Sequence, residues 1–186
     1  MKQLLLLGGG HAHVHVLRAL ARAPLRDTQV SLASPFDHTI YSGMVPGLIA
    51  GRFGEDDCAI DVVPLAKAAG VHLRIGQATA LDAAARQVTL ADGEQIGYDV
   101  LSINTGPVQD RDRIPGAREH ALFVRPIEHF VRLQAELQAL AAQRVLDIVV
   151  IGGGAAGVEL AFALHQALAV AHSGEERARI ALVTGG

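Results

Sequence analysis

The sequence predicts an α/β fold in which helices alternate with the strands of a parallel sheet. Two passages of the same design carry this prediction, residues 2–14 and residues 147–160. Each runs from a short apolar segment through three consecutive glycines into a helical pattern of apolar residues. A continuous apolar run is typical of a strand that is buried on both faces, as the strands of parallel sheets are.

The residues between the two passages supply further elements in the order that such a sheet needs. Pro64 and Gly70 mark the first turn and the end of a helix. The pair Asp92-Gly93 is typical of the turn of a β-hairpin. The expected elements are a helix at 63–69 and strands at 29–33, 71–75, 86–90, 95–98 and 99–103, the last of them buried.

The second half of the chain begins with a predicted linker, residues 107–118, which is rich in proline, glycine and mixed charge. Pro126 then opens a helix, a further helix is expected at 155–171, and a last strand at 180–183. The helix that Pro126 opens has an apolar face, made of Phe130, Leu133, Leu137 and Leu140.

The second strand–glycine–helix passage has only just returned to its sheet where the sequence ends. Two parallel strands and one helix cannot cover both faces of a doubly wound sheet. We therefore expect the chain to be part of a longer protein or to be completed by a partner. Because exposed apolar strand edges promote pairing between chains, we also expect the isolated chain to self-associate through residues beyond about 126.

The composition excludes several classes of protein. Half of the 186 residues are hydrophobic and 19% are charged, which excludes a disordered chain. The net charge is −3 and aromatic residues make up 4%, so neither a basic stripe nor stacking platforms for nucleic acid are expected. The single cysteine excludes a disulfide framework and favours a reducing, cytoplasmic setting. No apolar run reaches the length of a membrane span, so we place any peripheral membrane contact outside this chain.

The second glycine motif, Gly152-x-Gly154-x-x-Gly157, predicts a dinucleotide-binding loop because it follows a strand and opens a helix. Gly152 permits the tight turn, Gly154 lets the backbone approach a diphosphate, and Gly157 lets the helix pack close to the strand. The N-terminus of the helix supplies N–H groups and a partial positive charge for the phosphates.

The first motif departs from this pattern, because it reads Gly8-x-Gly10-x-x-His13. A histidine replaces the third small residue, so the helix must stand further from the strand or His13 must turn aside. His11 falls at the helix start, where an anion would sit. Two interpretations of His11 stay open, one close to a bound diphosphate and one as a capping or solvent-facing residue.

Two other features of these loops bear on ligands. His11 and His15 share a helix face, but without a matched carboxylate or cysteine they make a poor metal site, so no metal is expected. The acidic residue that usually binds an adenosine ribose is replaced by Ser34 in the first passage and Thr184 in the second. A hydroxyl discriminates less between cofactors, so the sequence does not choose between NADH and NADPH.

Four segments of the chain resemble the FAD-dependent pyridine nucleotide-disulfide oxidoreductases, and within them the type II NADH dehydrogenase-like branch. Residues 8–13 read Gly-Gly-Gly-His-Ala-His, and residues 98–106 read Tyr-Asp-Val-Leu-Ser-Ile-Asn-Thr-Gly. The third segment is the second glycine motif within residues 148–161. The fourth, residues 35–47, resembles a bacterial subgroup that is often fused ahead of selenide, water dikinase. The resemblance covers essentially the whole chain.

The resemblance implies a Rossmann-like FAD-binding domain over residues 1–108, with a β-hairpin inserted beside its parallel sheet. It implies that residues 109–186 begin a second Rossmann-like domain, which binds NAD(P)H. Asn104 stands where the family has alanine in its Ala-Thr-Gly turn. The implied FAD-binding residues are Gly8, Gly10, His11, Ser34, Ala78, Thr105 and Gly106, and those for NAD(P)H are Gly152, Gly154, Gly157 and Glu159. Glu159 is implied near the nicotinamide, with a solvated helix charge as the alternative.

The resemblance also implies an enzyme that moves a hydride from NAD(P)H to FAD and electrons on to a quinone or another acceptor. The sequence ends before the segment that completes the flavin domain in the family, so we expect this chain alone to be inactive. It lacks the redox cysteine pair of the disulfide reductases, and no catalytic residue is predicted. The alternative is a nucleotide-binding regulatory module without turnover, linked to selenium metabolism.

Overall fold

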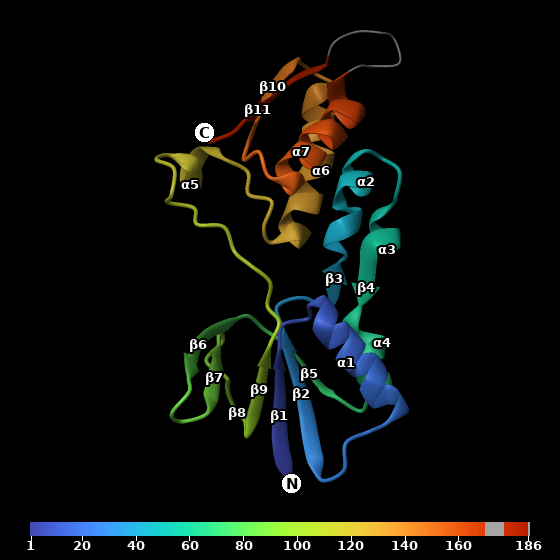
Figure 1. Cartoon of the computed structure of the whole chain (residues 1–186), viewed down its shortest axis with the longest axis vertical. Helices are drawn as coiled ribbons and strands as arrows, with labels where there is room; N and C mark the ends of the chain where they lie inside the picture. The colour runs from blue at the N-terminus through green and yellow to red at the C-terminus, as the bar shows by residue number, and fades with distance from the viewer. Residues whose placement is uncertain (170–176, 186) are drawn as a thin grey trace. The chain divides into compact units, whose positions relative to one another are not determined.

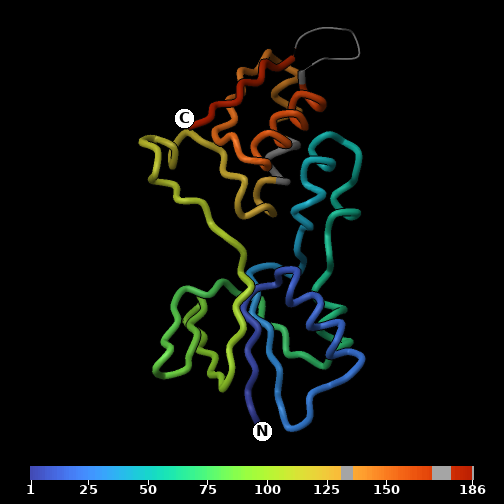
Figure 2. The backbone as a smooth tube through the Cα atoms, in the orientation of Figure 1, coloured from blue at the N-terminus to red at the C-terminus, as the bar shows by residue number. Residues whose placement is uncertain are grey.

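The computed structural model describes residues 1–169 and 177–185. The chain forms two compact units, one of Met1–Thr39 with Ala59–Pro107 and one of Ile40–Cys58 with Val108–Gly186. It therefore passes from one unit to the other three times (Figure 2). The predicted boundary at residue 108 falls where the third passage occurs, whereas residues 40–58, which we expected in the first domain, group with the second unit. The functional division into an FAD and an NAD(P)H domain stays a prediction.

The first unit is built on a parallel sheet of four strands in the order β5-β2-β1-β9 (Figure 1). Its strands are β1 (Lys2–Leu7), β2 (Thr28–Ser34), β5 (His72–Ile75) and β9 (Val100–Ile103). The central strand β1 pairs with β2 on one side and with β9 on the other. The predicted α/β fold with a parallel sheet is confirmed.

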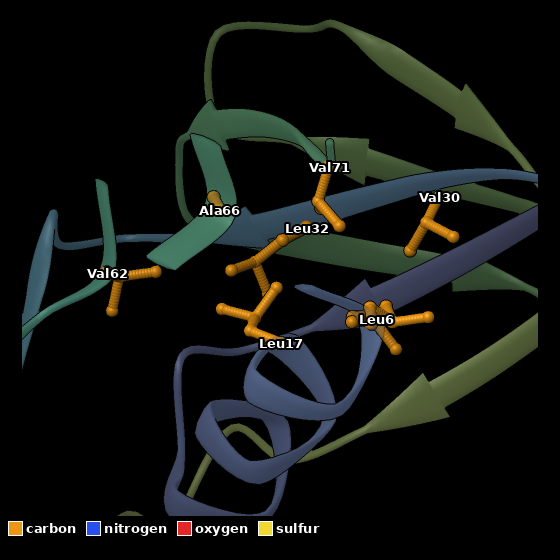
Figure 3. Packing of buried hydrophobic residues seen from close by; sticks show 8 residues of the cluster. Leu6, Leu17, Val30, Leu32, Val62, Ala66 and Val71 are labelled. Carbon is orange, nitrogen blue, oxygen red and sulfur yellow. The ribbon is translucent and has the colours of Figure 1, made fainter. Parts of the chain in front are cut away.

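Two helices, α1 (His11–Arg22) and α4 (Val62–Ala68), cover one face of this sheet. Leu17 of α1 and Val62 of α4 meet Leu6 and Leu32 of the two central strands in one apolar cluster (Figure 3). Each of these side chains is at most 2% exposed. Because burying a leucine or valine stabilises a fold by roughly 1.5–3 kcal/mol, this cluster fixes the start of α1 against the end of β1.

The other face of the sheet packs against a small antiparallel sheet of β6 (Ala78–Asp82), β7 (Gln87–Leu90) and β8 (Gln95–Gly97). Val88 and Leu90 of β7 are buried against Leu5 and Leu7 of β1. The predicted hairpin is present as β7 and β8. The strand β6 was not predicted, because most of its residues are exposed and no apolar alternation marks them.

The second unit contains a two-stranded parallel sheet, β10 (Leu146–Ile151) and β11 (Ala178–Val183). The helix α7 (Ala155–Leu164) packs against both strands and against α2 (Val45–Ile49). The short strands β3 (His38–Ile40) and β4 (Ala59–Asp61) pair where the chain leaves the first unit and returns to it. The other elements are η1 (Ser42–Met44), α3 (Glu55–Cys58), α5 (Ala117–His120), α6 (Ile127–Ala141) and a π-helical segment η2 (His165–Ala169).

Three expectations need correction or completion. The strands at β9 and β10 are not buried on both faces, because Val100, Ile103, Val149 and Ile151 are all more than half exposed. The side chains of a strand point to the two faces of its sheet, and at these four positions the face is left open to solvent. The expected helix 155–171 changes to π-helical geometry after Leu164, and its last two residues lie outside the described part of the chain.

The apolar face predicted for α6 is only partly buried. Phe130 is 4% exposed, whereas Leu140 at the other end of the helix is 38% exposed. The side chain of Leu133 lies outside the described residues. The next residue, Ala141, is buried at 5% exposure, so the end of α6 still packs against the unit and only the face that carries Leu140 is open to solvent.

Candidate functional site

The carboxyl ends of the four parallel strands of the first unit meet at one edge of the sheet. The loop Gly8–Gly10 leaves β1 at this edge, between β2 on one side and β9 on the other. The order of the strands reverses between β1 and β9, because β2 and β5 both lie on the far side of β1. Such a switch point is where open α/β sheets bind their ligands.

The end of β9 lies directly against the glycine loop. Gly8 has φ +93°, and a Cβ added to it would come within 2.6 Å of the carbonyl carbon of Asn104 and of Cα of Thr105. A Cβ at Gly10 would come within 2.7 Å of the carbonyl oxygen and of Cγ of the same Asn104. Both glycines are therefore required by β9, quite apart from any ligand.

Asn104 makes three hydrogen bonds to this loop and its helix. Its N–H donates to the carbonyl oxygen of Leu7 at 2.7 Å, and its own carbonyl oxygen accepts from the N–H of Gly10 at 3.2 Å. Its side-chain Oδ1 accepts from the N–H of Ala12 at 3.1 Å. Gly10 has no side chain with which to cap α1, so Asn104 caps this helix from another strand. The sequence pattern does not predict this role, because 92 residues separate Asn104 from Ala12.

His13 turns aside from the strand, which is one of the two arrangements that the sequence predicted. Its ring is buried, 1% exposed, and its Nδ1–H donates to the carbonyl oxygen of Gly8 at 2.6 Å. A carbonyl can only accept, so Nδ1 carries the proton, and in the neutral ring Nε2 accepts from the hydroxyl of Ser102 at 2.9 Å. The histidine thus ties the loop to β9.

Replacing His13 with alanine is expected to destabilise the first unit by about 2–4 kcal/mol. The substitution removes two buried hydrogen bonds and leaves a cavity where the ring was. Chemical unfolding of the 186-residue chain measures the loss. The matched control is His15→Ala on the exposed side of the same helix, which should change the free energy of unfolding by less than about 0.5 kcal/mol. Equal losses for the two variants would contradict the assigned role of His13.

The other residues predicted for the first site lie at the same edge of the sheet. Ser34 is 3% exposed, and its Oγ would be 3.0 Å from a Cβ at Gly9. Its carbonyl oxygen accepts from the N–H of Gly76 at 2.8 Å, which places the start of segment 76–78, and so Ala78, next to the end of β2. His11 is half-buried at the first position of α1. Thr105 and Gly106 follow Asn104 and are exposed.

The second glycine loop follows β10 and opens α7, as predicted. A Cβ at Gly157 would overlap the carbonyl oxygen of Gly152, so the helix lies too close to the strand for any side chain there. By contrast, a Cβ at Gly154 would meet no protein atom within 4 Å, and its backbone angles, φ −70° and ψ 170°, suit any residue. Within the described residues, no contact accounts for a glycine at position 154. Glu159 lies exposed on α7.

Asp37 and Cys58 are among the ionisable groups beyond these loops whose pKa values are shifted. A hydrogen bond of 2.7 Å between Asp37 and His38 holds the pKa of the Asp37 carboxyl below its usual value. Burial, followed by the charge of Asp57, raises the pKa of the Cys58 thiol. A buried thiol with a raised pKa is a poor nucleophile, so Cys58 fits a structural role.

No three histidine, cysteine, aspartate or glutamate side chains gather into a group that could hold a metal ion within residues 1–169 and 177–185. In the same residues, no helix is both long and apolar enough to cross a bilayer.

Comparison with known proteins was made for sequences and for structures. Among curated proteins, an NADH dehydrogenase-like protein of Bacillus subtilis, YutJ, is 28% identical over 167 residues, which are 89% of this chain and 46% of that protein. An NADH dehydrogenase-like protein of Mycobacterium tuberculosis is 31% identical over 168 residues, 87% of this chain and 42% of that protein. Demethylphylloquinone reductase NdbB of Synechocystis is 26% identical over 193 residues, which cover 99% of this chain and 46% of that protein. The chain spans less than half the length of these relatives.

Solved structures agree in fold. Sulfide:quinone oxidoreductase of Aquifex aeolicus superposes with a TM-score of 0.68 at 25% identity, over 89% of this chain and 39% of that one. The water-forming NADH oxidase of Lactobacillus brevis has a TM-score of 0.72 at 19% identity, over 98% of this chain and 46% of that one. At this identity the likeness supports the fold only. The sequence profile of the pyridine nucleotide-disulphide oxidoreductases matches residues 2–183. With two glycine loops at the ends of parallel strands and a profile match over nearly its whole length, the chain belongs to the pyridine nucleotide-disulphide oxidoreductase family.

Proposed function

We propose that the protein to which this chain belongs is an FAD-dependent oxidoreductase that takes a hydride from NAD(P)H and passes electrons to a quinone or another acceptor. The family is FAD-dependent and uses NAD(P)H. The observation that carries the proposal is the pair of strand–glycine–helix loops, one in each unit, which supplies a separate diphosphate site for each dinucleotide.

The residues of both loops fit these cofactors. The N-terminus of α1, with Gly8, Gly10 and His11, would hold the diphosphate of FAD, and Ser34 the adenosine ribose. The N-terminus of α7, with Gly152 and Gly154, would hold the diphosphate of NAD(P)H, because a ligand can approach the backbone at Gly154. The bound cofactors supply the hydride chemistry, while the chain binds and orients them. No acid or base is assigned to a side chain.

A quinone is the acceptor that the comparisons favour. NdbB is named a demethylphylloquinone reductase, and an Arabidopsis thaliana relative, 25% identical, is named an NAD(P)H-ubiquinone oxidoreductase. The choice between NADH and NADPH stays open, because Thr184 presents a hydroxyl at the second loop, where an acid would discriminate against the extra phosphate of NADPH.

The test is anaerobic mixing of NADH or NADPH with the protein at its natural length. The proposal predicts that the visible absorption band of the flavin bleaches and that a soluble quinone then restores it. A flavin that bleaches but is not reoxidised by quinone would point to another acceptor. A protein without flavin that still binds NADH would overturn the oxidoreductase proposal.

That last outcome would favour a second candidate, a nucleotide-binding regulatory module without turnover. Two observations support it, the hydroxyls in place of both ribose-binding acids and the resemblance of residues 35–47 to a subgroup fused to selenide, water dikinase. The module would then serve selenium metabolism. Turnover of NAD(P)H would exclude it.

We also propose that the protein is cytoplasmic, where its single cysteine stays reduced. Separately, we propose that the isolated chain self-associates. On one face of the β10–β11 sheet, Val149, Ile151 and Val183 are 57%, 59% and 49% exposed. A contiguous apolar face of this kind favours association. Light scattering is expected to show a dimer or larger species whose mass falls when Val149 and Ile151 are replaced by threonine. A monomer at high concentration would contradict this expectation.

A further inference from the structure

The two glycine loops differ in how their helix N-termini are occupied. The first four N–H groups of a helix have no partner within the helix, and these are the groups that bind phosphates. In α1 they belong to residues 10–13, and Asn104 accepts from two of them, those of Gly10 and Ala12. At the start of α7, Gly154 has no side chain with which to cap the helix, and among the described residues no further atom lies within 4 Å of its Cβ position.

We propose that Asn104 is a latch on the first loop, whose side chain and the diphosphate of FAD compete for the N–H of Ala12. This inference rests on the proposed function, because it takes the first loop to be the diphosphate site. Asn104 thereby sets the affinity of the loop. When the diphosphate binds, the amide oxygen gives up the N–H of Ala12 and the side chain turns away.

The geometry makes this a local change. Two hydrogen bonds fix the backbone of Asn104. Its N–H donates to the carbonyl oxygen of Leu7, and its carbonyl oxygen accepts from the N–H of Gly10. Neither bond involves the side chain. Rotation about the Cα–Cβ bond therefore releases Ala12 while β9 and the loop keep their places. A phosphate oxygen can replace the amide oxygen, because charge-assisted hydrogen bonds are about twice as strong as neutral ones.

The latch also explains why an amide suits this position. A carboxylate at position 104 would accept the same N–H and would gain from the positive end of the helix dipole, so it would hold the loop more firmly. It would also repel the phosphates. A methyl group would leave the N–H of Ala12 to the ligand. For stability of the chain without ligand, the order at position 104 is therefore aspartate, asparagine, alanine, from highest to lowest. For affinity toward the diphosphate the order is reversed.

The experiment compares the 186-residue chain with Asn104→Ala and Asn104→Asp, using ADP as the probe because it carries the diphosphate and adenosine of FAD. Calorimetric titration measures affinity, and thermal unfolding without ligand measures stability. Asn104→Ala is expected to bind ADP about fivefold more tightly, because the ligand no longer has to break a capping hydrogen bond of about 1 kcal/mol. The variant is also expected to melt about 2–4 °C lower. Asn104→Asp is expected to bind at least about tenfold more weakly and to melt no lower than the parent chain.

The control is Gln95→Ala, which removes an exposed amide side chain from β8 and should change neither quantity. Asn104 is the only asparagine in the sequence, so isotope-labelled asparagine gives a single pair of side-chain amide signals in NMR spectra. These signals are expected to move on addition of ADP.

Two results would overturn the latch. If Asn104→Ala binds ADP more weakly than the parent chain, the side chain assists the ligand or merely maintains the structure. If the labelled amide signals stay unchanged at saturation with ADP, the side chain does not leave Ala12. Failure of the proposed function looks different, because the parent chain itself would then bind neither ADP nor FAD.

Discussion

Replacing Gly8 with alanine is expected to destabilise the first unit by about 3 kcal/mol, far more than an alanine elsewhere at the same backbone angle. Two costs add. An L-residue at φ +93° costs roughly 1–2 kcal/mol. The new Cβ would also lie 2.6 Å from the backbone of Asn104 and Thr105, and overpacking against a rigid neighbour costs about 1–3 kcal/mol more. The backbone there is held by the bonds of Asn104 to Leu7 and Gly10, so it cannot yield cheaply.

Gly93→Ala is the matched control, because Gly93 has φ +90° and no atom within 4 Å of its Cβ position. Gly93→Ala therefore has the conformational cost of an L-residue at positive φ, without the steric overlap that a Cβ at Gly8 would cause. Urea unfolding of both variants separates the two contributions, and Gly8→Ala should lose at least about 1 kcal/mol more than Gly93→Ala. Equal losses would mean that the end of β9 moves aside, and the contact between loop and strand would then carry little of the stability.

The elements that the sequence predicted well are those whose signal is local. Both strand–glycine–helix passages, at β1–α1 and at β10–α7, join an apolar run, a glycine triplet and a helical period within fifteen residues or so. The hairpin of β7 and β8 has its turn residues between its strands. In each of these places, neighbouring residues decide both the backbone geometry and the burial.

The predictions that failed or stayed incomplete depend on contacts between distant residues. An apolar run such as β10 reads as buried on both faces, but burial depends on which elements lie above and below the strand. The cap of α1 by Asn104 could not be predicted, because the pattern around Gly10 contains no capping side chain and the residue that accepts from Ala12 follows 92 residues later. For His13 the sequence left two arrangements open, and the hydroxyl of Ser102 on β9 is the partner that accounts for the observed one.

In the second loop, a glycine needed for ligand binding can be distinguished from a glycine needed for the fold. Gly154→Val is expected to weaken binding of NAD(P)H strongly and leave the fold intact. The backbone angles at 154 suit valine, and no protein atom lies within 4 Å of the Cβ position. The side chain would stand where the diphosphate approaches the helix N-terminus. We expect the affinity for NADH to fall at least about 100-fold, which is roughly 3 kcal/mol, with an unchanged free energy of unfolding.

Gly157→Ala, three residues further along, is the complementary control, because it is expected to lower the stability of the fold. Its Cβ would overlap the carbonyl oxygen of Gly152, so α7 has to move away from β10 and the second unit should lose about 1–3 kcal/mol of stability. ADP binding at the first loop should survive Gly154→Val, because the two loops belong to different units and, under the proposed function, serve different cofactors. If Gly154→Val also weakens ADP binding at the first loop, or if NADH still binds with its usual affinity, the assignment of one loop to each dinucleotide is wrong.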